Sequence, residues 1–283
     1  VQGENTKRPD VVLYVNGMAL GVLELKRSTV SVSEGIRQNL DNQKKAFIRN
    51  FFTTMQLVMA GNDNQGLRYG TIETPEKYFL QWKEEGVSNP YANSLDFHLS
   101  LICNKQRFLQ IIHDFIVFDA GTKKTCRHNQ FFGIEEAKQR IAQREGGIIW
   151  HTRGSGKSLT MVWLAKWLRE NQTDARVLIV TDRTELDEQI EKVFSGVNEG
   201  IYRTKSGADL IATLNQPNPW LIGTLVHKFG RQGDDDTDES EQATHAFIEQ
   251  VTGSIPKDFK PKGNLFVFVD ECHRTQSGKL HEA

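Results

Sequence analysis

The stretch "GGIIWHTRGSGKSLT", residues 146–160, decides the fold of the second half of the chain. A short apolar run leads into a turn of small and polar residues, and the amphipathic segment "LTMVWLAKWLRE" follows at once. Apolar runs at 176–181, 219–224 and 264–271 then alternate with a second amphipathic segment at 185–194. Such alternation is typical of a parallel α/β sheet. We therefore expect a strand, a glycine-rich turn and a helix at the start of that sheet.

The turn "HTRGSGKS" (151–158) has the composition of a Walker A loop, although His151 replaces the usual first glycine. Its small residues let successive backbone N–H groups point at nucleotide phosphates. Lys157 would reach the β and γ phosphates, and the Ser158 hydroxyl would ligate Mg²⁺. The residues expected to bind ATP are Thr152, Gly154, Ser155, Gly156, Lys157 and Ser158.

A second part of the nucleotide site is expected in "LFVFVDECHR" (265–274), an apolar run that ends in two acids. Asp270 can hold Mg²⁺ through water, and Glu271 can polarise the attacking water. A solvated turn would also place two acids after a strand. The phosphate loop in the same α/β pattern favours a Walker B site, because these sheets bind ligands at the carboxyl ends of their strands.

The segment "DECHR" resembles the DEAD/DEAH-type box of superfamily 2 helicases and translocases. This resemblance implies an adenine-reading glutamine upstream of the phosphate loop. Gln130, in "CRHNQFFGIEEA", occupies that place, and Arg127 would assist it. The alternative is that Gln130 is a polar surface residue at the start of a helix.

The N-terminal region has a different pattern. "DVVLYV" and "ALGVLELK" read as two strands joined at Asn16-Gly17, which is a strong hairpin signal. The sequence further predicts a helix over 33–48 with a cap at Ser31 or Ser33, a strand within 54–61, and helical structure over 96–118.

Glu24 and Lys26 lie two positions apart in this apolar strand and therefore share one face of it. With an ideal two-residue turn, Asp10 would lie opposite Leu23, on the other face. The PD-(D/E)xK nuclease family, which "RPD" (8–10) and "ELK" (24–26) resemble, needs both acids on one face. The resemblance therefore predicts a three-residue turn or a bulge near Gly17, which pairs Asp10 with Glu24.

Two carboxylates and a lysine can bind a metal ion and activate water against a phosphodiester. "RPD" (8–10) and "ELK" (24–26) resemble the PD-(D/E)xK nuclease family in this way. Asp10 and Glu24 would be the metal ligands, and Lys26 would orient or activate the water. Gln38 matches the glutamine of the Q-x-x-x-Y helix of such nucleases, whereas Asn42 stands in the tyrosine position. The alternative is a surface ion pair on an edge strand, which contributes little to stability.

The order of these motifs resembles the restriction subunit of type I restriction-modification enzymes. The resemblance implies an α/β protein with a PD-(D/E)xK nuclease-like mixed sheet and helices in residues 1–118. Residues 119–283 would form the first RecA-like parallel α/β lobe of a superfamily 2 motor. ATP and Mg²⁺ would be the cofactors, and double-stranded DNA and the modification (methyltransferase) and specificity subunits would be the partners. The expected activity is ATP-dependent DNA translocation coupled to Mg²⁺-dependent cleavage.

Two other functions stay open. The N-terminal domain could keep the nuclease fold only as an inactive DNA-binding platform for the translocase. Alternatively, ATP binding could control assembly without any bond in DNA being broken.

Three cysteines without C-x-x-C spacing predict a reducing, cytoplasmic setting: Cys103, Cys126 and Cys272. No apolar run reaches the roughly 20 residues that span a bilayer, so we expect no membrane contact.

Overall fold

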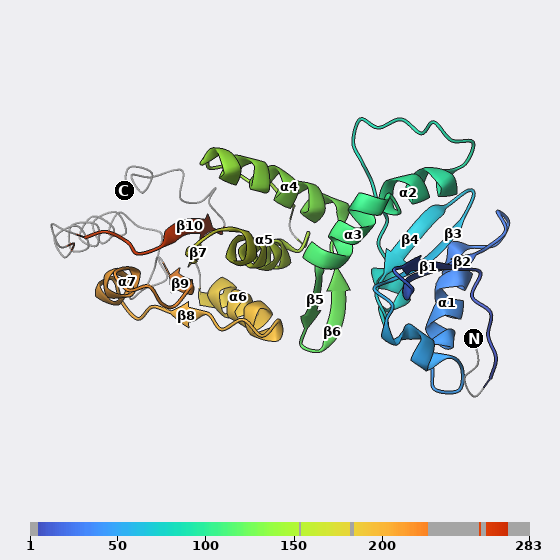
Figure 1. Cartoon of the computed structure of the whole chain (residues 1–283), viewed down its shortest axis with the longest axis horizontal. Coiled ribbons are helices and arrows are strands. Elements are labelled where there is room, and N and C mark those ends of the chain that lie inside the picture. The colour runs from blue at the N-terminus through green and yellow to red at the C-terminus, as the bar shows by residue number, and fades with distance from the viewer. Residues whose placement is uncertain (1–4, 153, 182–183, 226–254, 256–258, 271–283) are drawn as a thin grey trace, which may run out of the picture. The chain divides into compact units, whose positions relative to one another are not determined.

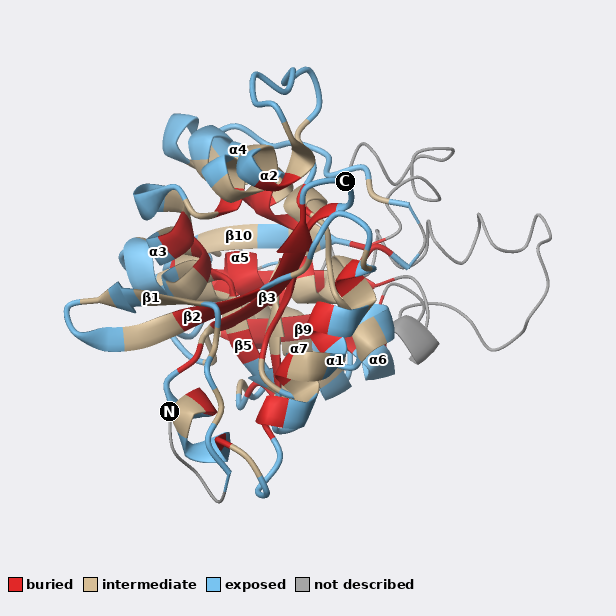
Figure 2. Cartoon of the chain, turned by 90° about the vertical axis from the view of Figure 1, so that its right-hand side faces the viewer, coloured by how far each residue is buried: buried red, intermediate tan, exposed pale blue. Residues whose placement is uncertain are grey.

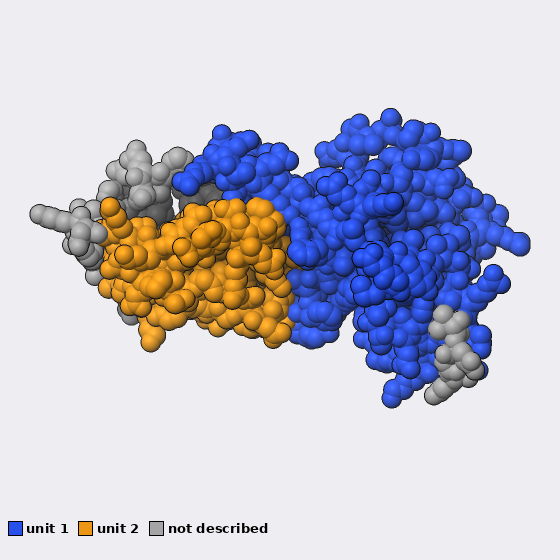
Figure 3. All heavy atoms as spheres, viewed as in Figure 1, with its two compact units in different colours: residues 1–157 blue, residues 158–283 orange. Residues whose placement is uncertain are grey.

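The computed structural model describes residues 5–152, 154–181, 184–225, 255 and 259–270 (Figure 1). The chain divides into two compact units, residues 1–157 and 158–283 (Figure 3). The predicted domain boundary at 118/119 falls earlier in the chain than this division, inside the first unit, and stays a prediction about domain limits.

The first unit contains a mixed sheet, as expected. Its strands lie in the order β1 (Val11–Val15), β2 (Met18–Leu25), β3 (Leu57–Asn62) and β4 (Gly66–Gly70). The β1–β2 and β3–β4 pairs are antiparallel, whereas β2 and β3 are parallel. Every residue of β3 is buried, and Figure 2 shows this central strand in red.

The β1–β2 hairpin has the predicted bulge. Asn16 and Gly17 both have positive φ angles, 49° and 81°, and form a two-residue turn in which Val15 pairs with Met18. The register then shifts, because Tyr14 pairs with Ala19 but the preceding residue pairs with Gly21. Leu20 is therefore the extra residue. Beyond the shift Val11 lies opposite Leu23, so Asp10 comes level with Glu24.

Helix α1 (Val32–Asn42) crosses from β2 to β3, and the Ser31 hydroxyl caps it by accepting the Ser33 N–H at 3.3 Å. The prediction of a helix to residue 48 is wrong. The chain turns after Asn42 and enters the short 3-10 helix η1 (Arg49–Thr53). This turn lets Ile48 and Phe52 pack against Val22 and Val58 of the sheet, which a continued helix would not allow.

The helical structure predicted over 96–118 is confirmed up to Asp114, in two helices, and is wrong for the last residues. Helix α2 (Ser94–Ile102) ends before Asn104, whose side chain caps α3 (Lys105–Asp114) by accepting two backbone N–H groups. The remaining apolar residues form β5 (Ile116–Asp119), which pairs with β6 (Thr122–Thr125). A second 3-10 turn, η2, covers Glu76–Tyr78.

Helix α4 (His128–Gln143) follows this hairpin, and the phosphate loop then leads into α5 (Lys157–Asn171). The apolar run 146–150 was expected to be a strand, and this expectation is wrong. A strand needs a neighbour for its backbone hydrogen bonds, and no described strand pairs with it. Its apolar side chains are exposed, and Trp150 is 83% exposed.

The second unit contains the predicted parallel sheet, with strand order β10-β7-β9-β8. Helices separate most of the strands along the chain, as the alternating pattern requires. The elements are β7 (Ala175–Thr181), α6 (Thr184–Gly196), β8 (Tyr202–Arg203), α7 (Gly207–Leu214), β9 (Leu221–Leu225) and β10 (Asn264–Val269).

Candidate functional site

The N-terminal sheet brings the two predicted carboxylates together. The Leu25 N–H donates to Asp10 Oδ2 at 2.8 Å, which holds the Asp10 side chain against the end of β2. Glu24 is fully buried on the face of β2 that α1 covers. The expected Asp10–Glu24 pairing therefore arises from the bulge at Leu20.

Helix α1 completes the group of side chains around Glu24. Gln38 donates from Nε2 to Glu24 Oε2 at 2.8 Å and accepts at Oε1 from Lys26 Nζ at 2.5 Å. One glutamine thus joins the carboxylate to the ammonium. Asn42, one turn later, donates to Glu24 Oε1 at 3.4 Å. Sequence reasoning left the role of Asn42 open, and the structure places it on the carboxylate.

Gly35 explains how the helix comes this close. A Cβ at this position would lie 3.0 Å from the Ala60 Cβ and 3.5 Å from the Glu24 carbonyl oxygen. The absent side chain therefore lets α1 lie directly on β2 and β3. Sequence reasoning missed Gly35; the signal that could have found it is a glycine inside a helix, where it costs about 1 kcal/mol relative to alanine.

The surroundings of Glu24 shift its proton equilibrium. Burial, followed by the negative charge and the hydrogen bond of Asp10, raises the pKa of Glu24 to about 7, although Lys26 and Lys7 act in the opposite direction. Two acids that disfavour each other's ionisation are stabilised when a cation joins them.

A divalent cation fits this donor set. Mg²⁺ prefers oxygen ligands and is commonly held by one or two carboxylates, with water completing its shell. Asp10 and Glu24 supply two such groups. No cluster of three or more His, Cys, Asp or Glu side chains that could hold a metal occurs among the described residues. Any metal here would therefore depend on these two acids, backbone oxygen and water.

The phosphate loop has the backbone that its sequence requires. Gly154 and Gly156 have φ angles of +78° and +88°, which side chains other than glycine rarely adopt. The Ser155 N–H donates to the Thr152 carbonyl at 3.2 Å and closes the turn. Lys157 opens α5, so the loop lies at a helix N-terminus as predicted.

Two buried side-chain atoms in this loop, Ser155 Oγ and His151 Nδ1, have no hydrogen-bond partner in the described part of the chain. Burial lowers the pKa of His151, and the charge of Lys157 adds to this. An orphaned hydroxyl and left-handed glycines at a helix N-terminus suit a phosphate group, which accepts several hydrogen bonds. The loop therefore fits a nucleotide triphosphate.

Helix α4 brings the other two predicted nucleotide residues to the loop. Arg127 donates from Nη1 to the Gly154 carbonyl at 3.1 Å. Gln130 donates from Nε2 to the Gly156 carbonyl at 2.9 Å. Both side chains thus contact the loop backbone.

The predicted Walker B residues are described in part. Asp270 follows β10, is 8% exposed, and donates its N–H to the Val180 carbonyl of the neighbouring strand at 3.0 Å. It therefore lies at the carboxyl end of the parallel sheet, as expected. Glu271 lies outside the described residues.

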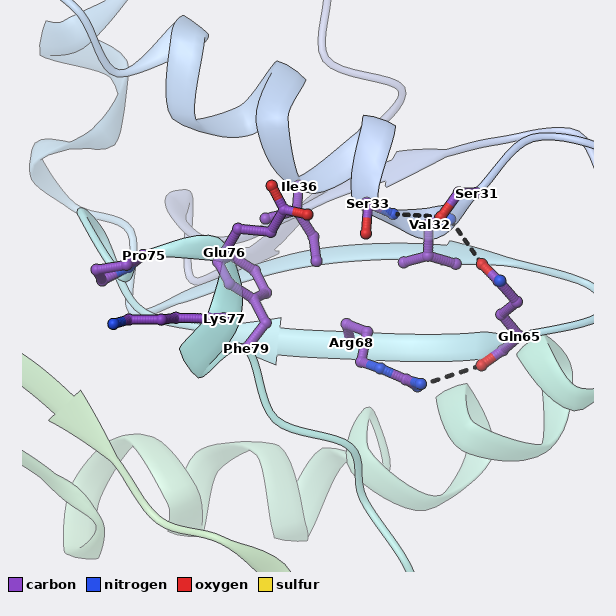
Figure 4. A pocket seen from close by; sticks show the side chains of 10 residues that line it. All are labelled: Ser31, Val32, Ser33, Ile36, Gln65, Arg68, Pro75, Glu76, Lys77 and Phe79. Atoms are coloured by element: carbon purple, nitrogen blue, oxygen red, sulfur yellow. Dashed lines mark hydrogen bonds between the residues drawn. The ribbon is translucent and has the colours of Figure 1, made fainter.

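A separate pocket of about 560 Å³ lies in the first unit, between the start of α1, strand β4 and η2 (Figure 4). Arg68 lines it and donates to the carbonyls of Gln65 and Leu67. Glu76, on the opposite wall, is paired with Arg37 at 2.8 Å. None of the predicted site residues lines this pocket. Its ten lining residues are Ser31, Val32, Ser33, Ile36, Gln65, Arg68, Pro75, Glu76, Lys77 and Phe79.

Comparison with known proteins adds two family matches. Residues 129–283 match the model of the SWI2/SNF2 ATPase family, and residues 1–77 match that of the type I restriction enzyme R protein N terminus. In the part of the chain that the structure describes, no helix is long and apolar enough to cross a membrane.

Several curated proteins resemble the chain along most of its length. The putative type I restriction enzyme MjaIXP endonuclease subunit of Methanocaldococcus jannaschii is 27% identical over 97% of this chain and 27% of its own length. The SauCOLORF180P endonuclease subunit of Staphylococcus aureus is 24% identical over 97% and 28%. The HindI endonuclease subunit of Haemophilus influenzae is 26% identical over 96% and 27%. The chain thus spans just over a quarter of the length of these relatives.

Proposed function

Since the chain belongs to the SWI2/SNF2 ATPase family and carries the N-terminal region of type I restriction R proteins ahead of the ATPase region, we propose that it supplies a nuclease centre and the first part of an ATP-driven DNA motor. In this role it acts in a type I restriction enzyme, together with modification and specificity subunits. Its substrate is double-stranded DNA, and its cofactors are ATP and Mg²⁺. In this role it would act in the cytoplasm.

The observation that carries the nuclease proposal is the connected group of Asp10, Glu24, Lys26 and Gln38. An isolated surface ion pair would be exposed and would not need a fully buried carboxylate. Here the glutamine bridges the carboxylate and the ammonium, which fixes both side chains before any substrate binds. This group supports the PD-(D/E)xK assignment.

Asp10 and Glu24 would hold Mg²⁺, which lowers the pKa of a bound water and offsets charge on the phosphodiester. Gln38 keeps the Lys26 ammonium next to the carboxylates, where it can orient the attacking water and stabilise negative charge on the phosphate. Asn42 holds the second oxygen of Glu24. These residues therefore separate into metal ligands, a water-orienting cation and two amides that fix them.

For the motor, the loop backbone and Lys157 would bind the triphosphate, and Ser158 and Asp270 would hold its Mg²⁺. Glu271 would polarise the attacking water, as the resemblance to superfamily 2 motors implies. Arg127 and Gln130 would complete the nucleotide site. ATP turnover would then drive movement along DNA, and cleavage would take place at the separate carboxylate centre.

The test is plasmid cleavage and ATP hydrolysis by the full-length protein, assembled with its partner subunits, ATP and Mg²⁺. Lys26→Ala should abolish cutting and leave ATP hydrolysis intact, and Lys157→Ala should abolish both. Unchanged cutting in Lys26→Ala would show that the carboxylate group is structural and that the domain is only a platform. If DNA does not raise ATP turnover in the wild type, the motor assignment is wrong and a nucleotide-dependent switch is favoured.

A further inference from the structure

The phosphate loop is held from one side by the start of α4. Gln130 is 3% exposed, and its amide oxygen accepts the Arg127 backbone N–H at 2.8 Å while its nitrogen donates to Gly156. Arg127 reaches Gly154 at the same time. The carbonyls of both left-handed glycines of the loop, Gly154 and Gly156, are therefore held by residues at the start of this helix. The shape of the loop depends on where α4 begins.

The start of α4 is in turn fixed to the N-terminal sheet. The Tyr69 hydroxyl, on β4, donates to the carbonyl of Cys126 at 2.9 Å. Both residues are fully buried, and Cys126 directly precedes Arg127. A buried hydrogen bond of this kind is costly to break, because the carbonyl would lose its partner without gaining water.

Aromatic packing also holds the start of α4 close to Tyr69 of β4. The Trp82 ring lies 6.2 Å from the Tyr69 ring and 5.2 Å from that of Phe131, measured between centroids. Phe131 also packs on Phe115 at 5.0 Å and follows Gln130 in the chain. The first turn of α4 is thus packed against the Trp82 and Phe115 rings, and close packing leaves these side chains little freedom to shift.

We propose that Tyr69 is a positioning residue for the nucleotide site, acting through Cys126, Arg127 and Gln130 on the phosphate loop. This inference rests on the proposed binding of ATP. It makes the N-terminal sheet part of the ATP machinery, because the sheet that carries the carboxylates also positions the loop. Tyr69 pairs with Met59, and Met59 pairs with Leu23, the neighbour of Glu24.

The same geometry gives Gln130 a task at the loop in addition to the adenine reading that the resemblance implies. Its oxygen and one N–H are already used by the backbone of Arg127 and Gly156. A side chain that shapes the loop acts on the binding of the triphosphate, which ATP and GTP share. Loss of the Tyr69 hydroxyl should therefore weaken the binding of ATP and GTP by the same factor.

The experiment measures ATP and GTP binding, together with kcat and KM for ATP hydrolysis, in the full-length protein carrying Tyr69→Phe. The expected result is a three- to tenfold rise in Kd for both nucleotides and in KM, with little change in kcat, since the hydroxyl touches no reacting atom. Tyr14→Phe is the matched control, because Tyr14 lies on β1 of the same sheet and is 63% exposed. It should change nothing.

Equal binding constants in Tyr69→Phe and wild type would overturn the inference, as would a loss restricted to ATP in Tyr69→Phe. Phe131→Leu, which removes ring packing at the start of α4, should raise Kd in the same direction as Tyr69→Phe. Failure of the proposed function itself has another signature: the wild-type protein would not bind ATP, and Lys157→Ala would have no effect.

Discussion

The carboxylate centre and the phosphate loop are organised by different parts of the chain. At the carboxylate centre side chains bond to side chains, with Gln38 between Glu24 and Lys26. At the phosphate loop side chains bond to backbone, with Arg127 and Gln130 on the carbonyls of two glycines. The comparison teaches that a metal centre needs correctly directed oxygen atoms, whereas a phosphate site needs a correctly curved backbone. The two regions should therefore fail in different ways when they are mutated.

The largest effect is expected at Gly156. A Cβ there would lie 2.5 Å from Gln130 Nε2, and the φ angle of +88° disfavours any side chain. Gly156→Ala should lower ATP hydrolysis by the full-length protein at least tenfold, because the glutamine must leave the loop. Gly154→Ala is the control: it has a similar φ angle, but a Cβ would meet nothing within 4 Å. Equal losses in the two variants would mean that backbone strain, and not the Gln130 contact, matters.

The next effect separates the two amides at the carboxylate centre. Gln38→Ala removes two short hydrogen bonds, to Glu24 and Lys26, whereas Asn42→Ala removes one at 3.4 Å. We expect DNA cleavage to fall about tenfold or more in Gln38→Ala and about twofold in Asn42→Ala. ATP hydrolysis should be unchanged in both. A parallel fall in ATP hydrolysis would show that the two regions are not separate.

A smaller effect, on stability, is expected where α1 packs on the sheet. In Gly35→Ala the new methyl would meet the Ala60 Cβ at 3.0 Å, so the helix must shift away from β3. We expect the free energy of unfolding to fall by about 1–3 kcal/mol, the usual cost of an overpacked contact. The double variant Gly35→Ala/Ala60→Gly should recover most of the loss of packing. Denaturant unfolding measures the stability of the single and the double variant. If Gly35→Ala is as stable as wild type, Gly35 is not needed for the close approach of α1 to the sheet.

The smallest effect is a pH dependence of stability at Lys123 of β6, which belongs to neither region. Burial lowers the pKa of Lys123 to about 8 from its ordinary 10.5, and its ammonium donates to the Met55 carbonyl at 2.9 Å. The unfolded chain therefore binds more protons than the folded chain between these values. Stability should rise as the pH increases from about 8 to about 10.5.

Lys123→Met should remove this part of the pH dependence and leave the ATP site unchanged. Thermal unfolding across that pH range, at fixed ionic strength, measures how stability changes with pH. Lys124→Met is the control, since Lys124 is more exposed and pairs with Asp119 at 2.5 Å. The same slope in wild type and Lys123→Met would contradict the assignment.

Local rules predicted several features correctly. Asn16-Gly17 predicted the hairpin, and the need to bring Asp10 level with Glu24 predicted a bulge, which lies at Leu20. The alternating apolar runs after residue 175 predicted the parallel sheet. The hairpin and the alternating runs depend on residues close together in the chain, where periodicity and turn chemistry are decisive, whereas the bulge follows from the resemblance to the nuclease family.

The predictions were wrong where contacts between residues distant in the chain decide the limits of a helix or strand. The helix predicted to residue 48 ends at Asn42 because the chain turns there, which lets Ile48 pack in the core beside Val58. The helical pattern over 96–118 divides at Asn104, and its last residues pair with β6 instead. An apolar run at 146–150 reads as a strand, but a strand exists only where another strand accepts its hydrogen bonds.

The sequence by itself determined the chemistry of this protein: which residues carry carboxylate, ammonium and small side chains, and which stretches can be strands or helices. Only the tertiary structure decided that Gln38 bridges Glu24 and Lys26, that Asn42 joins them, and that Tyr69 fixes the carbonyl before Arg127. The physical reason is distance along the chain. Residue type and local spacing are written in the sequence, whereas contacts between remote residues depend on how the elements pack.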